Sequence, residues 1–244
     1  MLKWSEIDYK RFHLKTAKLT IDDQHIDIAP IIEIFQKENG RLFIIRCNSG
    51  LNDVIHQLHK TGFFLTDTML TYSINVKDSN LSKKYTDKFQ IVTALADDSE
   101  ILGEMAQSSF AGYRSHYHKN PFLDNQLCDQ VYIDWARNLV IKEGMSDVVF
   151  IAKSGNKSVG FASLKVENGE AKAGLLGVIP EYRGLGISHI LHQERFQWCK
   201  SNSINNIVVE TSLSNINYIT ILSDLGFKLH SSKHVFHLVH NHPE

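Results

Sequence analysis

Length, composition and charge limit the functions open to this chain. Its 244 residues, 43% of them hydrophobic and 22% charged, suffice for one large or two small globular domains. Because 26 basic residues balance 27 acidic ones, the net charge of −1 gives no indication of nucleic-acid or membrane-surface binding. The three cysteines lie far apart and in no metal-ligand spacing, so we predict reduced, buried thiols at Cys47, Cys128 and Cys199.

Targeting signals are not evident at the N-terminus. It reads M-L-K-W-S-E-I-D and lacks the apolar core of a signal peptide, and no segment is apolar for long enough to span a bilayer. We therefore expect a cytoplasmic protein without a membrane partner.

The first third of the chain alternates strand and helix patterns. We predict a smaller α/β domain at 1–76, followed by a polar, glycine-free linker at 77–88. In the domain we expect strands at 11–21, 41–47 and 63–76 and helices at 31–38 and 52–60.

The remainder, 89–244, is predicted to be a larger α/β domain. We expect helices at 99–107, with Ser99 as a possible N-cap, and at 125–142, 186–201 and 216–224. We expect strands at 89–95, 148–153, 159–167, 171–178, 207–211 and 227–239.

A helix, a Gly-Phe pair and a strand follow one another twice, with the pairs at 62–63 and 226–227. Two interpretations remain open. The echo is an internal repeat, which makes 1–76 a degraded half-copy without a phosphate loop, or it is the common join in which glycine ends a helix.

The most informative stretch is 178–188, which reads V-I-P-E-Y-R-G-L-G-I-S between a predicted strand and a predicted helix. Backbone N–H groups of such a loop form a concave nest, and the helix adds its unpaired first-turn donors and positive dipole end. Glycine lets a ligand approach the backbone. The stretch therefore predicts a seat for a phosphate or pyrophosphate, and an ordinary strand–loop–helix turn is the alternative.

The spacing of the glycines excludes two common phosphate-binding motifs. A dinucleotide-binding fingerprint needs a third glycine where His189 stands, and a P-loop needs a lysine after Gly186. The segment instead resembles the pyrophosphate loop of the GCN5-related N-acetyltransferases (GNATs), whose pattern is Arg/Gln-x-x-Gly-x-Gly/Ala. Arg183, Gly186 and Ser188 take its three positions, and Ser188 departs slightly from the pattern.

Two further segments resemble the GNATs that acetylate a dTDP-linked 4-amino sugar, the dTDP-fucosamine acetyltransferases. They are S-S-F-A-G-Y-R-S-H-Y at 108–117 and Y-I-D-W-A-R-N-L at 132–139. The resemblance covers nearly the whole chain. It implies a GNAT fold, a mixed, mostly antiparallel sheet flanked by helices, with a smaller N-terminal domain like a partial GNAT half. It also implies acyl-CoA as co-substrate, no metal, a nucleotide-linked amino-sugar partner, a role in O-antigen or other cell-surface polysaccharide synthesis, and a homodimer by family habit.

The resemblance also implies where coenzyme A binds. The strand would hold the pantetheine arm and the loop the pyrophosphate, so the candidate residues are Leu176, Gly177, Val178, Arg183, Gly184, Leu185, Gly186, Ile187, Ser188 and Asn215. Gly177 would ease the divergence of this strand from 207–211; a packing glycine is the alternative.

The candidates for proton transfer are less clear. Many relatives place a tyrosine seven residues after the asparagine matched by Asn215, as general acid for the leaving thiolate, but Leu222 stands there. Tyr218, one helical turn earlier, could substitute, although it could equally be a core tyrosine. His116 and Glu210 are candidate bases, with a surface histidine and an ordinary strand carboxylate as the alternatives. An amine bound in its neutral form needs no strong base.

For the acceptor, Arg114 and Arg137 could take a diphosphate, because arginine suits bidentate phosphate contacts. Stacking on thymine or sugar could come from Tyr113, Tyr117 and Tyr132. The alternative is a solvated basic face and an amphipathic helix that buries Trp135, and we favour the latter for Trp135 itself. His234 and His237 have opposite parity on a strand, so no metal site is expected there.

The predicted function is therefore acyl transfer from acyl-CoA to the amine of a dTDP-linked deoxyamino sugar. Acetyl is the default acyl group, and a longer one such as 3-hydroxybutanoyl remains open. One alternative is the same reaction on another amine, such as a protein N-terminus, a polyamine or an aminoglycoside. The other is an acyl-CoA-binding module without catalysis, which Leu222 in place of tyrosine permits.

Overall fold

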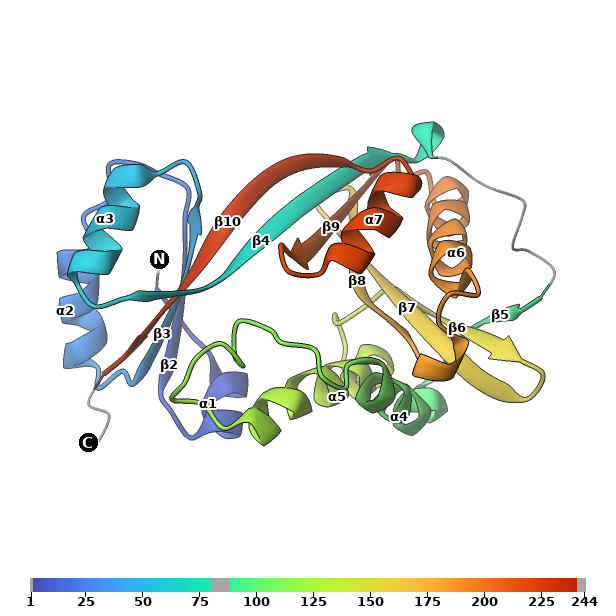
Figure 1. Cartoon of the computed structure of the whole chain (residues 1–244), viewed down its shortest axis with the longest axis horizontal. Coiled ribbons are helices and arrows are strands. Elements are labelled where there is room, and N and C mark those ends of the chain that lie inside the picture. Colours follow the sequence, from blue (N-terminus) through green and yellow to red (C-terminus); the bar gives the residue numbers. More distant parts are fainter. Residues whose placement is uncertain (1, 80–87, 241–244) are drawn as a thin grey trace.

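The computed structural model describes residues 2–79 and 88–240, and this part of the chain is mixed α/β. Within it ten strands form one sheet in the order β1-β2-β3-β10-β4-β9-β8-β7-β6-β5, with helices against its faces (Figure 1). Neighbouring strands are antiparallel except for the pairs β2–β3 and β8–β9. The predicted fold class, a mostly antiparallel sheet flanked by helices, is confirmed.

The elements before residue 80 form one end of the sheet. They are β1 (Lys3–Trp4), α1 (Glu6–Phe12), β2 (Thr16–Ile21), α2 (Ala29–Lys37), β3 (Leu42–Asn48), α3 (Asn52–Lys60) and β4 (Phe64–Asn75). The elements after residue 87 are β5 (Gln90–Thr93), α4 (Ser99–Ser109), α5 (Asn125–Ile141), β6 (Val148–Ser154), β7 (Lys157–Glu167), β8 (Glu170–Val178), α6 (Ile187–Ser201), β9 (Asn206–Ser212), α7 (Ile216–Asp224) and β10 (Lys228–Val239).

Most predicted elements are present, and the clearest error lies at 11–21. The chain there is helical to Phe12 and turns at His13, whose φ of 54° is left-handed, so the strand begins only at Thr16. The helix α1 was missed although Ser5 caps it by accepting a hydrogen bond from the Asp8 N–H group. Ser99 is not an N-cap: it lies in the first turn of α4, after Asp98.

Two five-element series have the same order and pairing. The N-terminal repeat, β2-α2-β3-α3-β4, and the C-terminal repeat, β8-α6-β9-α7-β10, each begin with two parallel strands. Their last three elements begin at 42, 52 and 64 and at 206, 216 and 228, so each is shifted by 164 positions. This regular shift favours an internal repeat as the origin of the Gly-Phe echo.

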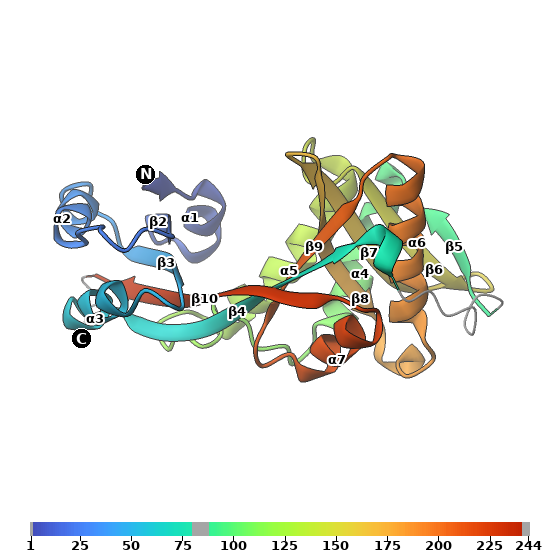
Figure 2. The ribbon, with the colours of Figure 1, turned by 90° about the horizontal axis from the view of Figure 1, so that it is seen from above.

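The two repeats exchange their last strands. Strand β10 lies between β3 and β4, and β4 lies between β10 and β9, so each final strand pairs with the other repeat. Figure 2 shows β4 and β10 running side by side from the part of the molecule that holds α3 to the part that holds α7. Most of the predicted linker, 80–87, lies outside the described residues. The division into two domains stays a prediction, since both parts share one sheet.

Three clusters of buried side chains form the core. The largest lies among α4, α5, α6, α7 and the strands they cover, and a second lies beneath α2 and α3. The third joins Phe12, Tyr117 and Val235, and so attaches the loop 110–124 to β10 and to the N-terminal part. This attachment places the loop below β4 and β10, as Figure 1 shows.

The remaining structural predictions concern cysteines, metals and membranes. Cys47, Cys128 and Cys199 are buried and free, as predicted, and burial raises the pKa of their thiols to about 11, 12 and 11. Across 2–79 and 88–240, no group of three or more His, Cys, Asp and Glu side chains is placed to hold a metal ion. In the same residues, no helix combines the length and apolar character needed to cross a bilayer.

Candidate active site

The glycine loop after β8 has the geometry of an anion seat. Gly184 and Gly186 have φ angles of 77° and 83°, a left-handed conformation that glycine adopts without strain. Gly186 precedes α6, whose first turn has no side-chain cap, so no capping side chain competes with a phosphate for the N–H groups at the start of this helix. The Arg183 side chain ties the loop to β8 and α4. Its Nε donates to the Val178 carbonyl at 3.2 Å, and its Nη2 donates to the Ser109 carbonyl at 2.8 Å.

Strands β8 and β9 diverge beside this loop. They pair only from Ala171 to Ala173, whereas β8 remains paired with β7 as far as Val178. From Gly174 onward β8 therefore has no partner strand on its β9 side, and a gap opens there. Such a gap is what an extended ligand arm needs in order to pair with exposed backbone groups of β8.

A buried arginine stabilises an irregularity in the pairing of β7 with β8, and the sequence analysis missed this residue. Arg195 of α6 is fully buried, and its Nη2 atom donates to the Ser163 and Leu175 carbonyls, each at 2.9 Å. These carbonyls lie where the β7–β8 register shifts between Ala162 and Leu164. Because buried carbonyls need a partner, Arg195 allows the irregularity to exist inside the protein. The available signal was a charged residue among apolar ones in the predicted helix 186–201.

Gly177 is a close-approach position. A Cβ atom there would lie 2.7 Å from Phe161 Cε1 and 3.0 Å from Ser109 Oγ. The missing side chain thus lets the end of α4 approach β8. The Ser109 hydroxyl is buried without a hydrogen-bond partner in the described structure, and it lies at the wall of the cleft. Sequence reasoning did not single it out.

One cleft of about 1380 Å³ connects these features with the N-terminal part of the chain. Its wall includes the diverging strand, the glycine loop, the end of α4, part of the loop 110–124, one face of α5, and side chains of α1, β2 and β3. Nine of the ten residues predicted for coenzyme A line it, and the exposed Leu185 does not. Those nine are Leu176, Gly177, Val178, Arg183, Gly184, Gly186, Ile187, Ser188 and Asn215.

Residues 110–227 match the family model described as the acetyltransferase (GNAT) family. The chain has the GNAT acetyltransferase fold. Proteins of this family use acyl-CoA, and the loop and the strand divergence lie where the match runs. No curated protein matches the chain in a sequence search.

Solved GNAT structures resemble nearly the whole chain, including its N-terminal part. A GCN5-related N-acetyltransferase from Sphaerobacter thermophilus has a TM-score of 0.67 and 11% identity, over 98% of this chain and 76% of that one. A GCN5-related N-acetyltransferase from Kribbella flavida has a TM-score of 0.65 and 10% identity, over 97% of this chain and 86% of that one. A tandem GNAT protein from the clavulanic acid biosynthesis pathway has a TM-score of 0.60 and 11% identity, over 94% of this chain and 76% of that one. At these identities the likeness concerns the fold alone.

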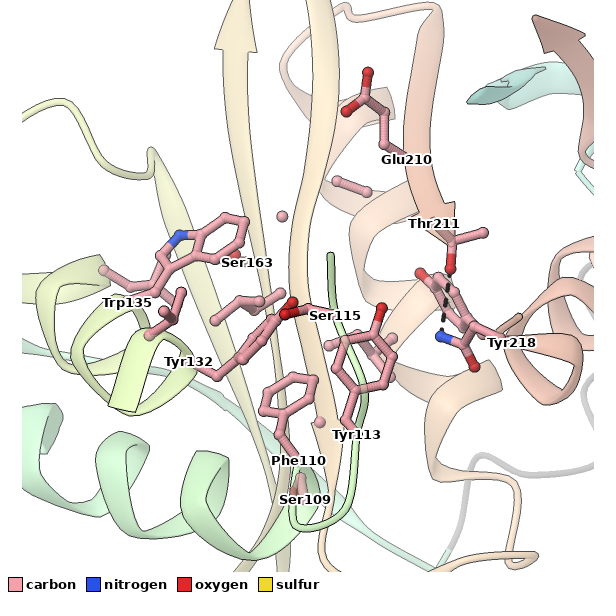
Figure 3. A pocket seen from close by; sticks show the side chains of 18 of the residues that line it. Ser109, Phe110, Tyr113, Ser115, Tyr132, Trp135, Ser163, Glu210, Thr211 and Tyr218 are labelled. Atoms are coloured by element: carbon pink, nitrogen blue, oxygen red, sulfur yellow. Dashed lines mark hydrogen bonds between the residues drawn. The ribbon is translucent and has the colours of Figure 1, made fainter. Parts of the chain in front are cut away.

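The part of the cleft beside α5 is lined by aromatic rings (Figure 3). Phe110 stacks on Tyr132 at 4.8 Å between ring centroids, and Tyr113 meets Tyr132 edge-on at 5.4 Å. Burial raises the pKa of both tyrosines, so their hydroxyls are neutral at pH 7. Trp135 also lines the cleft and is 38% exposed. The expectation that α5 buries Trp135 is therefore wrong, because this face of the helix borders the cleft.

Arg114 and Arg137, the predicted diphosphate ligands, do not line the cleft. Arg137 pairs with Glu100 at 2.9 Å between α5 and α4, and Arg114 approaches the Asn125 side chain at 3.5 Å. Hydrophobic pattern alone could not show which face of α5 meets the cleft.

Other cations reach the cleft from the N-terminal part, and each is paired with an acid. Arg46 of β3 contacts Glu210 of β9 at 3.0 Å across two intervening strands, and both side chains are partly exposed. Lys18 pairs with the buried Asp8, which also accepts a 2.9 Å hydrogen bond from the Tyr117 hydroxyl. Tyr117 lines the cleft, but its hydroxyl is thus engaged.

Tyr218 reaches the cleft from α7, whereas Leu222 is fully buried in the core. The Tyr218 hydroxyl lies 3.1 Å from His192 Nε2. Burial raises the pKa of Tyr218, an effect that Arg195 partly offsets, so the hydroxyl is protonated at neutral pH and can donate. Nearby, the Asn215 amide donates to Thr211 Oγ1 at 3.3 Å, the dashed contact in Figure 3.

The two candidate bases occupy different settings. Glu210 is half-exposed in its ion pair with Arg46, at the cleft wall (Figure 3). His116 also lines the cleft, but its Nδ1 atom lies 3.0 Å from Nε2 of His237. Burial, with added repulsion from His237 and nearby cations, holds the pKa of His116 well below its ordinary value. His116 is therefore neutral at pH 7.

Proposed function

We propose that this protein transfers an acyl group from acyl-CoA to the amine of a dTDP-linked deoxyamino sugar. Acetyl, or a longer group such as 3-hydroxybutanoyl, is the acyl group. The observation that carries the proposal is one continuous cleft, which joins the glycine loop and the β8–β9 gap to an aromatic, cation-bearing chamber. Donor and acceptor can occupy it together, as direct transfer requires.

The donor would lie along β8. Its pyrophosphate meets the N–H groups of the glycine loop and of the first turn of α6, and its pantetheine arm pairs with β8 in the gap. A backbone N–H of 176–178 then faces the thioester oxygen and stabilises the negative charge that develops on it. Ser109 Oγ, unpartnered beside Gly177, supplies a further hydroxyl at this point.

The reaction would proceed by direct attack. The neutral amine adds to the thioester carbonyl carbon, the C–S bond breaks, and the proton of the new ammonium passes to water or to Glu210. Tyr218 donates its hydroxyl proton to the leaving thiolate and regains one from solvent. Because a thiol of pKa ~8.5 is a tolerable leaving group, this assistance is helpful without being indispensable.

The acceptor would lie against the aromatic rings. Tyr113 and Tyr132 stack on thymine or sugar, and Trp135 extends this surface. The diphosphate meets Arg46 and Lys18 in place of Arg114 and Arg137. The Arg46–Glu210 pair is exposed and therefore weak, so a phosphate can displace the carboxylate and free it near the amine.

A second candidate is the same reaction on a cationic amine such as a polyamine. Four carboxylates line the cleft, those of Asp8, Asp67, Asp134 and Glu210, and they would attract such an acceptor. Each is already paired with a cation, which makes this candidate the weaker one. The further proposals are a cytoplasmic enzyme, a homodimer, and a place in O-antigen or other polysaccharide synthesis.

A thermal-shift panel tests the proposal without knowledge of the acyl group. The protein is heated with dTDP, UDP or GDP, each with and without CoA; a ligand at 100 times its Kd stabilises the folded state by about 2.7 kcal/mol. We expect stabilisation by CoA and by dTDP, and less by UDP and GDP. Stabilisation by CoA and spermidine but no nucleotide would replace the sugar with a cationic amine. No stabilisation by CoA would contradict the proposal as a whole.

A further inference from the structure

Three side chains form a hydrogen-bonded series that ends at the cleft. Asn120 Nδ2 lies 2.9 Å from His237 Nδ1, and His237 Nε2 lies 3.0 Å from His116 Nδ1. Asn120 and His237 are almost completely buried, whereas His116 lines the cleft. The series joins the loop 110–124 to β10, and the proposed reaction does not use it.

The direction of each hydrogen bond follows from Asn120. Its Oδ1 atom accepts from the Phe122 backbone N–H group at 3.0 Å, so the NH2 group must face His237. An amide NH2 group only donates, so His237 accepts at Nδ1 and carries its proton on Nε2. That proton is donated to His116 Nδ1. His116 accepts there and carries its own proton on Nε2.

We propose that Asn120 and His237 hold His116 as a fixed Nε2–H donor, which hydrogen-bonds an oxygen atom of the acceptor and does not remove a proton from its amine. His116 thereby becomes a specificity residue that favours acceptors with a hydroxyl or phosphate oxygen at this point. Asn120 and His237 are positioning residues. The inference rests on the proposed function, because it assumes that the acceptor occupies this cleft.

The surroundings oppose protonation of His116. A second proton would have to enter at Nδ1, opposite the His237 Nε2–H group, and reversing His237 would turn Nδ1–H against the Asn120 NH2 group. Burial and neighbouring cations depress the pKa of His116, and burial lowers that of His237 to about 3. The titratable and charged groups that act on the pair are Asp8, Lys18, Arg46, Tyr117 and Lys119.

The substitution Asn120→Asp removes the constraint that keeps the His237 proton on Nε2. A carboxylate keeps the bond to the Phe122 N–H group but accepts at its other oxygen, so His237 can turn a proton towards it. The two histidines can then share an additional proton. Asn48→Asp is the matched control, because Asn48 Oδ1 likewise accepts from a backbone N–H group two residues on, that of Gly50 at 3.0 Å, and Asn48 does not line the cleft.

Imidazole ¹⁵N NMR reads the proton positions directly and needs no substrate. His116→Gln and His237→Gln assign the signals. In the wild type we expect both histidines neutral with the proton on Nε2 from about pH 5.5 to about pH 8, and in Asn120→Asp the uptake of one proton by the pair in this range. A proton on His116 Nδ1 in the wild type, or an Asn120→Asp spectrum like that of the wild type, overturns the inference.

His237→Gln keeps the test decisive where Asn120→Asp does not fold. A glutamine amide can accept from Asn120 and donate to His116 at nearly the same separation as the imidazole nitrogens, so His116 should keep its proton on Nε2. Loss of that state contradicts the inference.

Kinetics separate a donor from a base. With an active acceptor, His116→Leu, which removes the Nε2–H donor, should raise the acceptor KM by about 2- to 10-fold, the value of one neutral hydrogen bond, with a smaller change in kcat. Asn48→Asp should change neither. If the wild-type kcat/KM falls as the pH is lowered, with an apparent pKa between about 6 and 7.5, His116 acts as a base and the inference is overturned. If no acceptor is acylated, the proposed function fails, and the NMR result still decides the inference.

Discussion

The two repeats share their order but differ where a ligand would bind. In the N-terminal repeat β2 and β3 pair over six residues, from Thr16 to Ile21, and the connection to α2 contains no glycine. In the C-terminal repeat β8 and β9 pair over three residues, and two left-handed glycines precede α6. Divergence of the strands and the anion seat therefore occur together, in one repeat only. The N-terminal repeat, whose two parallel strands stay paired, is the closed repeat and contributes to the wall of the cleft. The C-terminal repeat, whose parallel strands diverge, is the open repeat.

Equivalent positions show which residues depart from the shared framework. Leu222 corresponds to Leu58, 164 positions earlier, and both are fully buried, so Leu222 occupies a packing position of the repeat. Tyr218 corresponds to the buried Val54, and Glu210 corresponds to Arg46, its own ion-pair partner. The open repeat thus carries a hydroxyl and a carboxylate where the closed repeat carries a methyl-bearing side chain and a cation.

The largest expected effect comes from Tyr218→Phe, which gives the open repeat the apolar character of its counterpart. Loss of the proton donor should lower kcat by about 10²-fold, within the usual range for general acid catalysis. Acyl donors with a more acidic leaving thiol should restore much of the rate. Tyr9→Phe, at an exposed position, is the control. A kcat equal to that of the wild type would show that thiolate leaves without help from Tyr218.

Gly177→Ala tests whether the divergence needs a missing side chain. The added methyl group would meet Phe161 at 2.7 Å and Ser109 at 3.0 Å and should displace β8, since close-packed sites do not absorb such overlap. A displacement of about 1 Å at the thioester should lower kcat/KM by about 10²-fold. Gly50→Ala, where the nearest atom is 3.5 Å away, should leave the rate unchanged. Equal rates for the two variants would contradict this role.

Arg46→Ala removes a cation of the closed repeat from the cleft. If Arg46 contacts the diphosphate, the KM of the acceptor should rise by about 10-fold, the value of a charged hydrogen bond, while CoA affinity is unchanged. Arg137→Ala is the matched control, because Arg137 pairs with Glu100 away from the cleft. A larger rise in the acceptor KM for Arg137→Ala than for Arg46→Ala would indicate that the diphosphate binds at Arg137 of α5 instead.

The smallest effect concerns stability. Burial raises the pKa of Asp8, but Lys18, Ser5 and Tyr117 outweigh it and hold the pKa below its usual value. A carboxylate with a lowered native pKa stabilises the fold above its unfolded pKa of about 3.9 and loses this contribution as pH falls through the native value. Asp8→Asn should therefore lower the unfolding free energy by about 1–3 kcal/mol at pH 7.

Urea unfolding of both proteins between about pH 2.5 and pH 7 provides the measurement. The difference between Asp8→Asn and the wild type should be constant above about pH 5 and should shrink as the solution is made more acidic. A difference that grows towards low pH would have the wrong sign for this explanation.

Local patterns sufficed for much of the fold. The helices at 52–60 and 216–224 were bounded correctly because apolar periodicity and a following glycine mark them in one short stretch. The glycine loop was recognised because its ligand seat is made of consecutive residues. The helix α1 was missed because its seven residues make only about two turns, too few for a helical periodicity to stand out.

Contacts between distant residues could not be predicted in this way. Arg46 and Glu210 meet only because β10 and β4 are exchanged between the repeats, a pairing that no local pattern encodes. The same holds for His237 and Asn120, which are 117 positions apart. Trp135 was expected in the core because an amphipathic pattern shows that a helix has two faces but not which face borders a cavity.

Acyl transfer itself tests the central claim most directly. The protein is incubated with acetyl-CoA and a dTDP-linked 4-amino sugar, with UDP- and GDP-linked amino sugars and spermidine as parallel acceptors, and products are weighed by mass spectrometry while free thiol is titrated. We predict one acetyl group on the dTDP-linked amino sugar and an equal amount of released CoA thiol, both reduced in Tyr218→Phe. Thermal stabilisation by CoA without acylation of any of these acceptors would contradict the account.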